Sequence, residues 1–299
     1  MIRCGIVAHG GAGSPSEYKD GCEAAAREGM KILEKGGKAL DAVMEAVRVL
    51  EDDERFNAGY GSVLRMDGKT VEMDAALMDS EGNMGAVIAI QNVKNPVLVA
   101  RAVMDTPHLI LCGKGAELLA RRMGFGPFDP VSPKARERHK KLVSLLKKEK
   151  WDELNLLWRE KDPRALWNFP VSYEEVFSSD TVGAVALDKN GLLAAANSTG
   201  GASPMMLGRV GDSPLPGCGF YAGPHCAVAA TGTGEAIIRR MLARSVYEKA
   251  ASGEGLRSAC DREISLFPSE VPVGVIAISK TEFAVSANRD MARFQFIKD

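Results

Sequence analysis

Three threonines in the second half of the chain stand beside glycines or at the ends of apolar runs. Thr181 begins such a run directly after a charged stretch, Thr199 ends the next run, and Thr231 lies in a Thr-Gly-Thr-Gly segment. A threonine hydroxyl is a weak nucleophile that needs an adjacent base. A cut just before Thr181 would supply one, because a free α-amino group has a pKa of about 7.7–8.0. The pattern indicates amide hydrolysis by a threonine, although Thr181 taken alone is better explained as a β-forming residue at the start of a strand.

Thr199 is predicted to lie beside Thr181. The sequence Lys189-Asn190-Gly191 forms a turn between the two apolar runs, so these runs pair as strands whose far ends meet at one edge of a sheet. A hydroxyl at that place can hydrogen-bond to Thr181 and orient it. A threonine at a strand end with no role is equally consistent with Thr199 alone.

Two charged groups suggest how a substrate is held. Arg209 and Asp212 lie close together in a loop that contains Gly208 and Gly211. The head group of an α-amino acid needs such a pair, a guanidinium for its carboxylate and a carboxylate for its ammonium group. The alternative is an ordinary surface ion pair, which is common and contributes little to stability.

The segment that contains Thr231, Gly232 and Gly234 precedes a predicted helix. Backbone N–H groups at the start of a helix stabilise negative charge, so the segment is a candidate oxyanion hole. A phosphate site is disfavoured, because Glu235-Ala236 follows where a P-loop needs Lys-Ser or Lys-Thr.

Two other classes of enzyme are disfavoured by what the sequence lacks. The segment that starts at His9 and runs to Gly13 resembles the oxyanion strand end of esterases, but the chain has no Gly-x-Ser-x-Gly elbow. The chain has four histidines, none at ligand spacing, so a catalytic metal is not expected. His9 is interpreted as a structural hydrogen-bonding residue.

The composition is that of a globular protein. In 299 residues, 45% are hydrophobic and 26% charged, and the formal net charge is −1, so no strong field favours nucleic acid or an anionic membrane. No apolar run approaches the roughly 20 residues of a membrane helix, and we expect no signal peptide. The six cysteines are scattered without a CxxC pair. This favours free buried thiols in a reducing compartment, and therefore a cytoplasmic location.

Strands and helices occur in blocks, which favours a layered α+β fold with antiparallel sheets over a doubly wound parallel sheet. A basic and then mixed-charge segment, residues 133–179, is interpreted as a solvated, partly helical linker. A nucleic-acid patch is the weaker alternative, because acidic residues interleave. The sequence predicts strands at about residues 5–8, 71–79, 84–92, 271–279 and 283–287, a strand that begins at Thr181 and an alanine-rich strand that ends at Thr199. It predicts helices at about 19–35, 39–50, 96–104, 115–123, 234–251 and 255–266.

Taken together, the motifs resemble the plant-type asparaginase and isoaspartyl peptidase family of N-terminal nucleophile hydrolases. The resemblance covers the whole chain except the linker and the extreme C-terminus. The matching segments are residues 9–13, 56–64, 72–79, 93–96 with the following helix, 181–188, 197–201, 208–214 and 231–235.

The resemblance implies the fold and the maturation of the chain. It implies one domain, residues 1–299, built as a four-layer αββα sandwich. It also implies that the chain cuts itself between Asp180 and Thr181, which gives an α subunit of residues 1–180 and a β subunit of residues 181–299. Relatives of this family pair as dimers of αβ units, so a homodimer is expected here.

The resemblance also implies a role for each candidate residue. Thr181 is then the nucleophile and Thr199 orients it, while Thr231 and Gly232 form the oxyanion hole. Arg209 binds the substrate α-carboxylate and Asp212 its α-amino group. By the same resemblance, Gly234 offers its carbonyl oxygen to the substrate amine, and Asn57 matches a residue that supports the nucleophile. It implies no cofactor for catalysis, but a structural sodium ion on backbone carbonyls of Leu50, Glu51, Asp53, Phe56, Ala58 and Tyr60.

The implied activity is hydrolysis of β-aspartyl dipeptides and of L-asparagine, with release of L-aspartate. Two features depart from the family pattern: Asp180 stands where many relatives have glycine, and the segment around Asn288 differs from the family's C-terminal motif. An Asp-Thr junction is also the pattern of the related N4-glycosylasparaginases, which are therefore one alternative. The other is an amino-acid-binding relative that never matures and has no activity.

Overall fold

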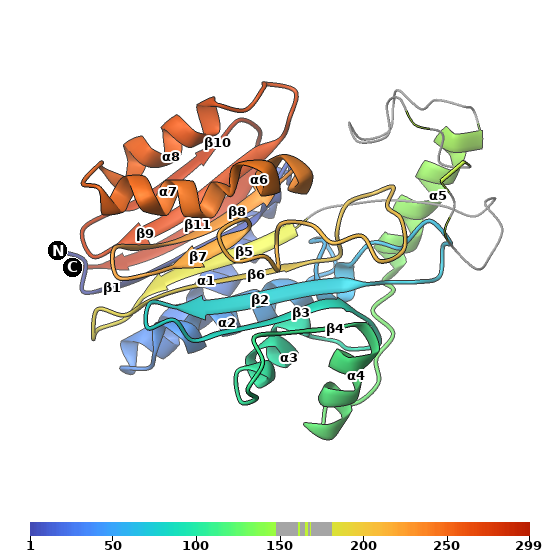
Figure 1. Ribbon diagram of the computed structural model, residues 1–299, viewed down its shortest axis with the longest axis horizontal. Coiled ribbons are helices and arrows are strands. Elements are labelled where there is room, and N and C mark those ends of the chain that lie inside the picture. The colour runs from blue at the N-terminus through green and yellow to red at the C-terminus, as the bar shows by residue number, and fades with distance from the viewer. Residues whose placement is uncertain (148–160, 162–164, 167, 169–180) are drawn as a thin grey trace.

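The computed structural model describes residues 1–147, 161, 165–166, 168 and 181–299, and Figure 1 shows its arrangement. Two sheets form the centre of the molecule. The larger has the strand order β11-β1-β5-β6-β2-β3-β4 and the smaller the order β10-β9-β8-β7. The strands are β1 (Cys4–Ala12), β2 (Met73–Asp79), β3 (Met84–Ile90), β4 (Ile110–Cys112), β5 (Thr181–Leu187), β6 (Leu193–Thr199), β7 (Phe220–Ala222), β8 (Cys226–Gly232), β9 (Val273–Ser279), β10 (Phe283–Ala287) and β11 (Met291–Lys298).

The strand pairing is almost entirely antiparallel, as the sequence predicts. Only β3 and β4 pair in parallel among the described strands. The structure is thus of the mixed α/β kind with antiparallel sheets. The edge strand β11 pairs with β1, so the two ends of the chain lie side by side: Cys4 lies opposite Lys298. Both termini lie at the same end of the molecule (Figure 1).

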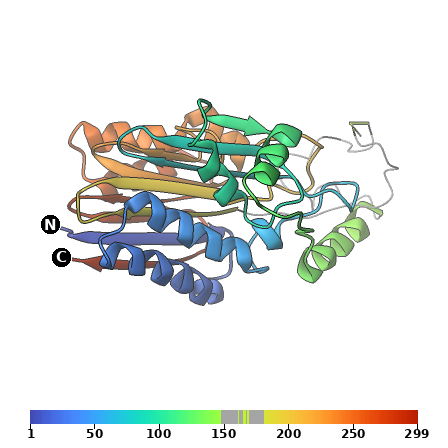
Figure 2. The same ribbon diagram turned by 90° about the horizontal axis from the view of Figure 1, so that it is seen from below.

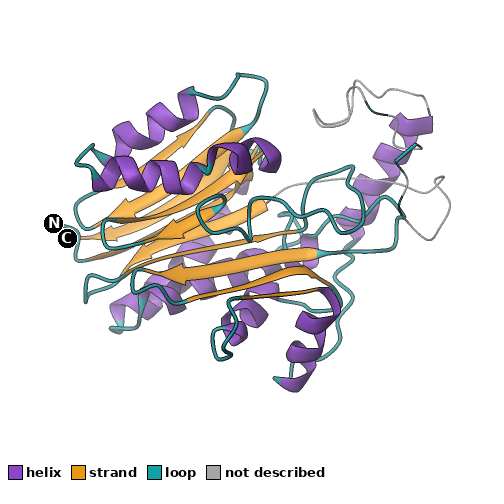
Figure 3. Cartoon of the chain, viewed as in Figure 1, coloured by secondary structure: helices purple, strands orange, loops and turns teal. Residues whose placement is uncertain are grey.

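Helices cover the outer face of each sheet (Figures 2 and 3). The larger sheet carries α1 to α4 and the smaller carries α6 to α8, while α5 extends away from the sheets. The helices are α1 (Lys19–Glu34), α2 (Ala39–Asp52), α3 (Pro96–Val103), α4 (Gly113–Arg122), α5 (Pro133–Lys147), α6 (Gly234–Arg240), α7 (Leu242–Ala251) and α8 (Leu256–Ser265), with short 3-10 turns at Ser16–Tyr18 and Gly59–Gly61.

The apolar stripe of α1 explains why that helix packs so closely. Its buried residues recur at helical spacing and are mostly small, among them Cys22, Ala25 and Gly29. A Cβ on Gly29 would lie 2.3 Å from a side-chain carbon of Ile6 in β1 and 2.7 Å from the carbonyl oxygen of Ala42 in α2. Any larger residue at this position would force the two helices and the strand apart.

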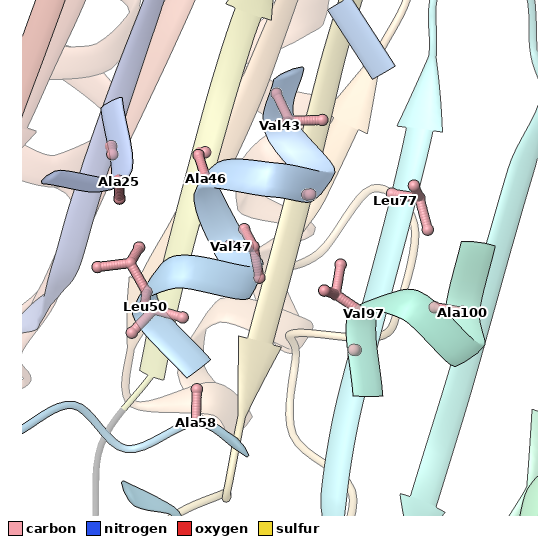
Figure 4. Packing of buried hydrophobic residues seen from close by; sticks show 14 of the residues in the cluster. Ala25, Val43, Ala46, Val47, Leu50, Ala58, Leu77, Val97 and Ala100 are labelled. Atoms are coloured by element: carbon pink, nitrogen blue, oxygen red, sulfur yellow. The ribbon is translucent and has the colours of Figure 1, made fainter. Parts of the chain in front are cut away.

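The buried apolar residues form separate clusters. One lies between α1 to α4 and the larger sheet, and Figure 4 shows part of it, with Val43, Val47 and Leu50 of α2 facing the strands. A second lies between α6 to α8 and the smaller sheet. A third lies where the two sheets face each other, with Val185 of β5 and Ile276 of β9 among its members. The sheets are therefore buried on both faces.

Several predicted elements differ from the observed ones. The helix predicted over residues 234–251 is interrupted at Met241, which has left-handed backbone angles (φ 48°, ψ 51°) and separates α6 from α7. The sequence did not predict β11. The linker segment contains the helix α5, which agrees with its interpretation as partly helical. All six cysteines are free, as expected, but Cys112 is exposed rather than buried. It lies on β4, the outermost strand of its sheet.

None of the helices within the described residues combines the length and the apolar character that crossing a membrane requires.

Candidate active site

Thr181 and Thr199 lie side by side because β5 and β6 pair along their whole length. Thr181 is the first residue of β5 and lies directly opposite Thr199, the last residue of β6. Their Oγ atoms are 2.7 Å apart, a hydrogen bond in which either hydroxyl can donate. Thr199 also accepts a hydrogen bond from the backbone N–H of Gly201 at 2.8 Å. The strand pairing predicted from the turn is thus confirmed.

The glycine-rich end of β1 contacts both Thr181 and Thr231. Gly11 has a φ of 112°, and a Cβ there would lie 2.6 Å from the carbonyl oxygen of Thr181, so only glycine allows this approach. The next residue, Ala12, donates its backbone N–H to Thr231 Oγ1 at 3.1 Å. Since Thr231 Oγ1 accepts this bond, its own proton can be donated to another group in the site.

His9 fixes the backbone of this strand end and takes no part in the cavity. Its Nδ1 accepts a hydrogen bond from the N–H of Gly11 at 3.1 Å, which places the ring proton on Nε2. Burial lowers the pKa of His9 to about 3, so the ring is neutral. The interpretation of His9 as a structural hydrogen-bonding residue is confirmed.

Gly232 ends β8, beside Thr231. Its φ is 133°, and a Cβ would lie 2.2 Å from the carbonyl oxygen of Pro272. This backbone conformation is accessible to glycine and strained for other residues. Thr231 and Gly232 therefore hold their place through the glycine conformation and through the pairing of β8 with β9.

Arg209 and Asp212 face each other across Gly234. A Cβ on Gly234 would lie 2.8 Å from Arg209 Nη2 and 2.9 Å from Asp212 Oδ1. The carboxylate of Asp212 is buried, and its Oδ2 atom has no hydrogen-bond partner. Burial raises the pKa of Asp212 to about 7, and the nearby Arg209 lowers it in part. A buried carboxylate of this kind needs a cation, which an incoming ammonium group can supply.

Glu235 is a residue of the site that the sequence reasoning missed. Its carboxylate accepts from Arg209 Nε at 2.9 Å and from Nη2 at 2.8 Å, a bidentate ion pair. This pair orients the guanidinium and leaves Nη1 on the other side, where it contacts the sulfur of Met205 at 3.7 Å. The signal was present in the sequence, since Glu235 follows the Thr-Gly-Thr-Gly segment directly, but we used it only to disfavour a phosphate site.

Six of the eight predicted site residues line one small cavity of about 40 Å³. It is bounded by Thr181, Thr199, Gly201, Ala202, Arg209, Gly211, Asp212, Ser213, Thr231 and Gly232. A volume of this size holds about one water molecule. The structure thus brings a hydroxyl, two candidate oxyanion donors and a head-group pair to one place.

The remaining two predicted residues lie beside the cavity. Gly234 separates Arg209 from Asp212, as described. Asn57 lies behind the loop that follows Thr199: its side-chain amide donates to the carbonyl oxygen of Gly201 at 2.7 Å, and its backbone oxygen accepts from Gly200. Asp180, the predicted residue before the cut, lies outside the described residues, as does most of the segment between 148 and 179.

The loop expected to hold a sodium ion folds back on itself after α2. A Cβ on Gly59 would lie 2.5 Å from the carbonyl oxygen of Glu51, and a Cβ on Gly61 would lie 1.9 Å from that of Phe56. Backbone oxygens thus crowd against glycines that leave room for them, and oxygen is the ligand that hard cations prefer. Across the described ranges, no group of three acidic, histidine or cysteine side chains is placed to hold a metal.

The chain is similar to proteins of one family over almost its whole length. A family model described as asparaginase matches residues 2–298. A plant-type L-asparaginase of Thermococcus kodakarensis is 39% identical, with 98% of this chain and 96% of the relative covered. An isoaspartyl peptidase/L-asparaginase of Mus musculus is 42% identical over 92% of this chain and 82% of its own length. A plant-type L-asparaginase of Pyrobaculum calidifontis is 40% identical, with 96% and 95% covered.

Proposed function

The chain belongs to the asparaginase family, and we propose that it is a threonine amidohydrolase that releases L-aspartate from β-aspartyl dipeptides and from L-asparagine. The relatives named above carry both activities in their names. The observation that carries the proposal is the single cavity lined by Thr181, Arg209, Asp212, Thr231 and Gly232. It unites a nucleophile, a head-group site and oxyanion donors.

Maturation supplies the base. We propose a cut between Asp180 and Thr181, after which the α-amino group of Thr181 has a pKa near the working pH, about 7.7–8.0. The product is an α subunit, residues 1–180, and a β subunit, residues 181–299, of one domain. The two helix-covered sheets support a four-layer αββα sandwich of the N-terminal nucleophile hydrolase kind.

In the proposed reaction, Arg209 binds the α-carboxylate of the substrate and Asp212 its α-ammonium group. Thr181 Oγ attacks the side-chain carbonyl carbon, and its proton passes to the Thr181 amine. The negative charge on the carbonyl oxygen accepts hydrogen bonds from the Thr231 hydroxyl and the Gly232 N–H. The C–N bond then breaks, the leaving amine takes the proton, and a β-aspartyl ester remains on Thr181. Water hydrolyses this ester and releases L-aspartate.

We make three further proposals. Carbonyl oxygens of Leu50, Glu51, Asp53, Phe56, Ala58 and Tyr60 would hold a sodium ion, which supplies positive charge to the loop and no chemistry. Exchange of sodium for tetramethylammonium is expected to lower the Tm, and added sodium should restore it.

The enzyme would act as a homodimer of αβ units. The absence of disulfides among the six cysteines supports a cytoplasmic location.

The proposal is tested by mass spectrometry of the purified protein, followed by a substrate panel. Wild-type protein should resolve into two chains with Thr181 at the new N-terminus, while Thr181→Ala stays intact. The panel contains β-aspartyl dipeptides, L-asparagine and an N4-glycosylated asparagine. Faster hydrolysis of the glycosylated substrate would favour the glycosylasparaginase alternative. A protein that stays in one piece and hydrolyses none of them would be the amino-acid-binding alternative.

A further inference from the structure

Among the side chains that the structure describes, the largest one that is fully buried is charged: Arg65. It begins the turn that leads into β2, and its ion-pair partner Glu72 lies at the end of the same turn, with the two charged groups 3.0 Å apart. Both side chains are almost completely removed from water. Buried ions need good geometry to be tolerated, so the partners of this pair show what it holds.

The pair joins the two ends of one loop, residues 200–208. Arg65 Nη1 donates to the carbonyl oxygen of Gly200 at 2.7 Å. Arg65 Nε donates to Glu72 Oε2 at 3.0 Å, and the same oxygen accepts from the backbone N–H of Gly208 at 2.8 Å. A second bond, from Arg65 Nη2 to the carbonyl oxygen of Glu72 at 2.8 Å, fixes the plane of the guanidinium. A continuous path of hydrogen bonds therefore connects Gly200 to Gly208.

Each end of this loop borders a part of the active site. Gly200 follows Thr199, whose hydroxyl contacts Thr181, and Gly208 precedes Arg209. The loop thus sets the span between the nucleophile and the guanidinium that would bind the substrate carboxylate. A substrate of the proposed function must bridge that span with its own carbon chain.

Stability alone does not account for the pair. Replacement of a buried ion pair by apolar residues of similar size is often neutral or stabilising. A planar guanidinium is instead suited to holding several oxygens in fixed directions. Here those oxygens belong to the loop and to the turn that carries Glu72.

We propose that Arg65 and Glu72 are a positioning pair that sets substrate length: by tying Gly200 to Gly208, they restrict the site to β-aspartyl substrates and exclude γ-glutamyl homologues with one more methylene. The inference rests on the proposed function, which fixes the two points that the substrate must join. One methylene typically changes kcat/KM between two substrates by about 10–200-fold. If the loop can shift, the enzyme should therefore lose a measurable part of its preference for the β-aspartyl substrate.

The test uses the double variant Arg65→Met/Glu72→Gln. Methionine keeps the length of Arg65 and removes its donors, and glutamine keeps an acceptor for the Gly208 N–H, so neither member of the pair leaves its partner as a lone charge. Kinetics are measured with a β-aspartyl and a γ-glutamyl dipeptide that share the same leaving amino acid. Rates are expressed per mole of free Thr181 N-terminus, so a maturation defect does not count as a catalytic one.

The β-over-γ ratio of kcat/KM is expected to fall by about tenfold or more, which corresponds to about 1.4 kcal/mol. KM for the β-aspartyl substrate should rise more than kcat falls, because the head-group site moves relative to an intact nucleophile. An unchanged ratio would overturn the inference, whatever happens to the absolute rates.

The matched control is Leu33→Ala, which loses a fully buried side chain of α1 away from the loop. It should lower stability and leave the β-over-γ ratio unchanged. If Leu33→Ala changes the ratio as much as the double variant does, any loss of stability changes it, and the inference is overturned. Wild-type protein that hydrolyses neither substrate would contradict the proposed function itself. An active wild type whose β-over-γ ratio is unchanged in the double variant would contradict only the inference about Arg65 and Glu72. If the double variant does not fold, Arg65→Lys keeps the charge but not the fork, and the same shift is expected.

Discussion

At the scale of single residues, the Thr231 hydroxyl can accept one hydrogen bond with its oxygen and donate another with its proton. Its oxygen accepts from the Ala12 N–H, so its proton can be donated to the oxyanion of the proposed reaction. Thr231→Ala is therefore expected to lower kcat by about 10²–10³-fold, the usual effect of losing one oxyanion donor, with little change in KM. Steady-state kinetics on a β-aspartyl dipeptide measure this. Thr231→Ser keeps the hydroxyl and should retain most activity; equal losses in both variants would contradict the assignment.

In the proposed reaction, Asp212 contributes to the acid side of the pH dependence of kcat/KM. Burial raises the pKa of Asp212 to about 7, so below that pH the free enzyme holds a neutral acid that cannot pair with the substrate ammonium group. We expect kcat/KM to rise more steeply below about pH 7, where the titration of Asp212 adds to that of the Thr181 amine, and less steeply above it. The effect of Asp212 on kcat should be weaker, because bound substrate lowers the pKa of Asp212.

The comparison variant for this pH profile is Asp212→Asn. It should have a low kcat/KM throughout and lack the acid limb that Asp212 causes. The Thr181 amine titrates higher, at about 7.7–8.0, and should appear in both kcat and kcat/KM. An acid limb near pH 7 that is unchanged in Asp212→Asn would show that another group controls it.

At the scale of elements, the break between α6 and α7 is a point of backbone strain. Met241 has a left-handed conformation that costs a residue with a Cβ about 1–2 kcal/mol, whereas glycine adopts it freely. Met241→Gly is expected to stabilise the protein by about 1 kcal/mol or less, since glycine also gains entropy in the unfolded chain. Urea unfolding of Met241→Gly and Met241→Ala measures this. If Met241→Gly is no more stable than Met241→Ala, the backbone at this position is not strained.

The position of Thr199 was predictable from the sequence because it depends on local information. The turn at Lys189-Asn190-Gly191 sets the register of β5 and β6, so the strand ends had to meet. The break at Met241 was not predictable in this way, because a methionine inside a helical pattern gives no local sign of left-handed angles. Nor was β11, whose partner β1 lies at the opposite end of the chain. Tertiary pairing decides these features.

The same distinction applies within the site. Residues next to glycines at strand ends were found, because that placement is itself a signal of exposed polar groups. Arg65 and Glu72 gave no such signal: they flank a polar turn, and a charged residue there is usually solvated. Only the path of the loop over them shows that they are buried. Likewise, the pairing of Glu235 with Arg209 depends on a loop that returns to α6.

At the scale of the whole molecule, the proposed cut would divide the strands of the larger sheet between two chains. In the order β11-β1-β5-β6-β2-β3-β4, strands β11, β5 and β6 belong to the β subunit and the others to the α subunit. The α-subunit strand β1 thus lies between two β-subunit strands. Both subunits are expected to elute together in size-exclusion chromatography under native conditions and to separate only in denaturant. Separation without denaturant would contradict this arrangement.

The stability of the whole fold should depend on pH in a direction set by its buried groups. Burial raises the pKa of Asp74 to about 6 and that of Asp212 to about 7. In the unfolded chain both carboxyl groups have an ordinary pKa of about 4 and are ionised above that pH. The folded state therefore binds more protons, and the stability from these groups is present below that pH and is lost as pH rises through 6 and 7.

His9 acts in the opposite sense. Its folded pKa of about 3 lies below the unfolded value of 6.5, so its neutral ring disfavours folding in acid and has no further effect once the pH exceeds about 6.5. The unfolding free energy of the uncut Thr181→Ala protein, measured in urea between pH 6.5 and 8, should therefore fall with increasing pH. Adding Asp212→Asn removes the group that titrates near 7, so the decline should become shallower. The same slope in both proteins would mean that Asp212 is already ionised in the fold, and its assignment as an acid awaiting a cation would fail.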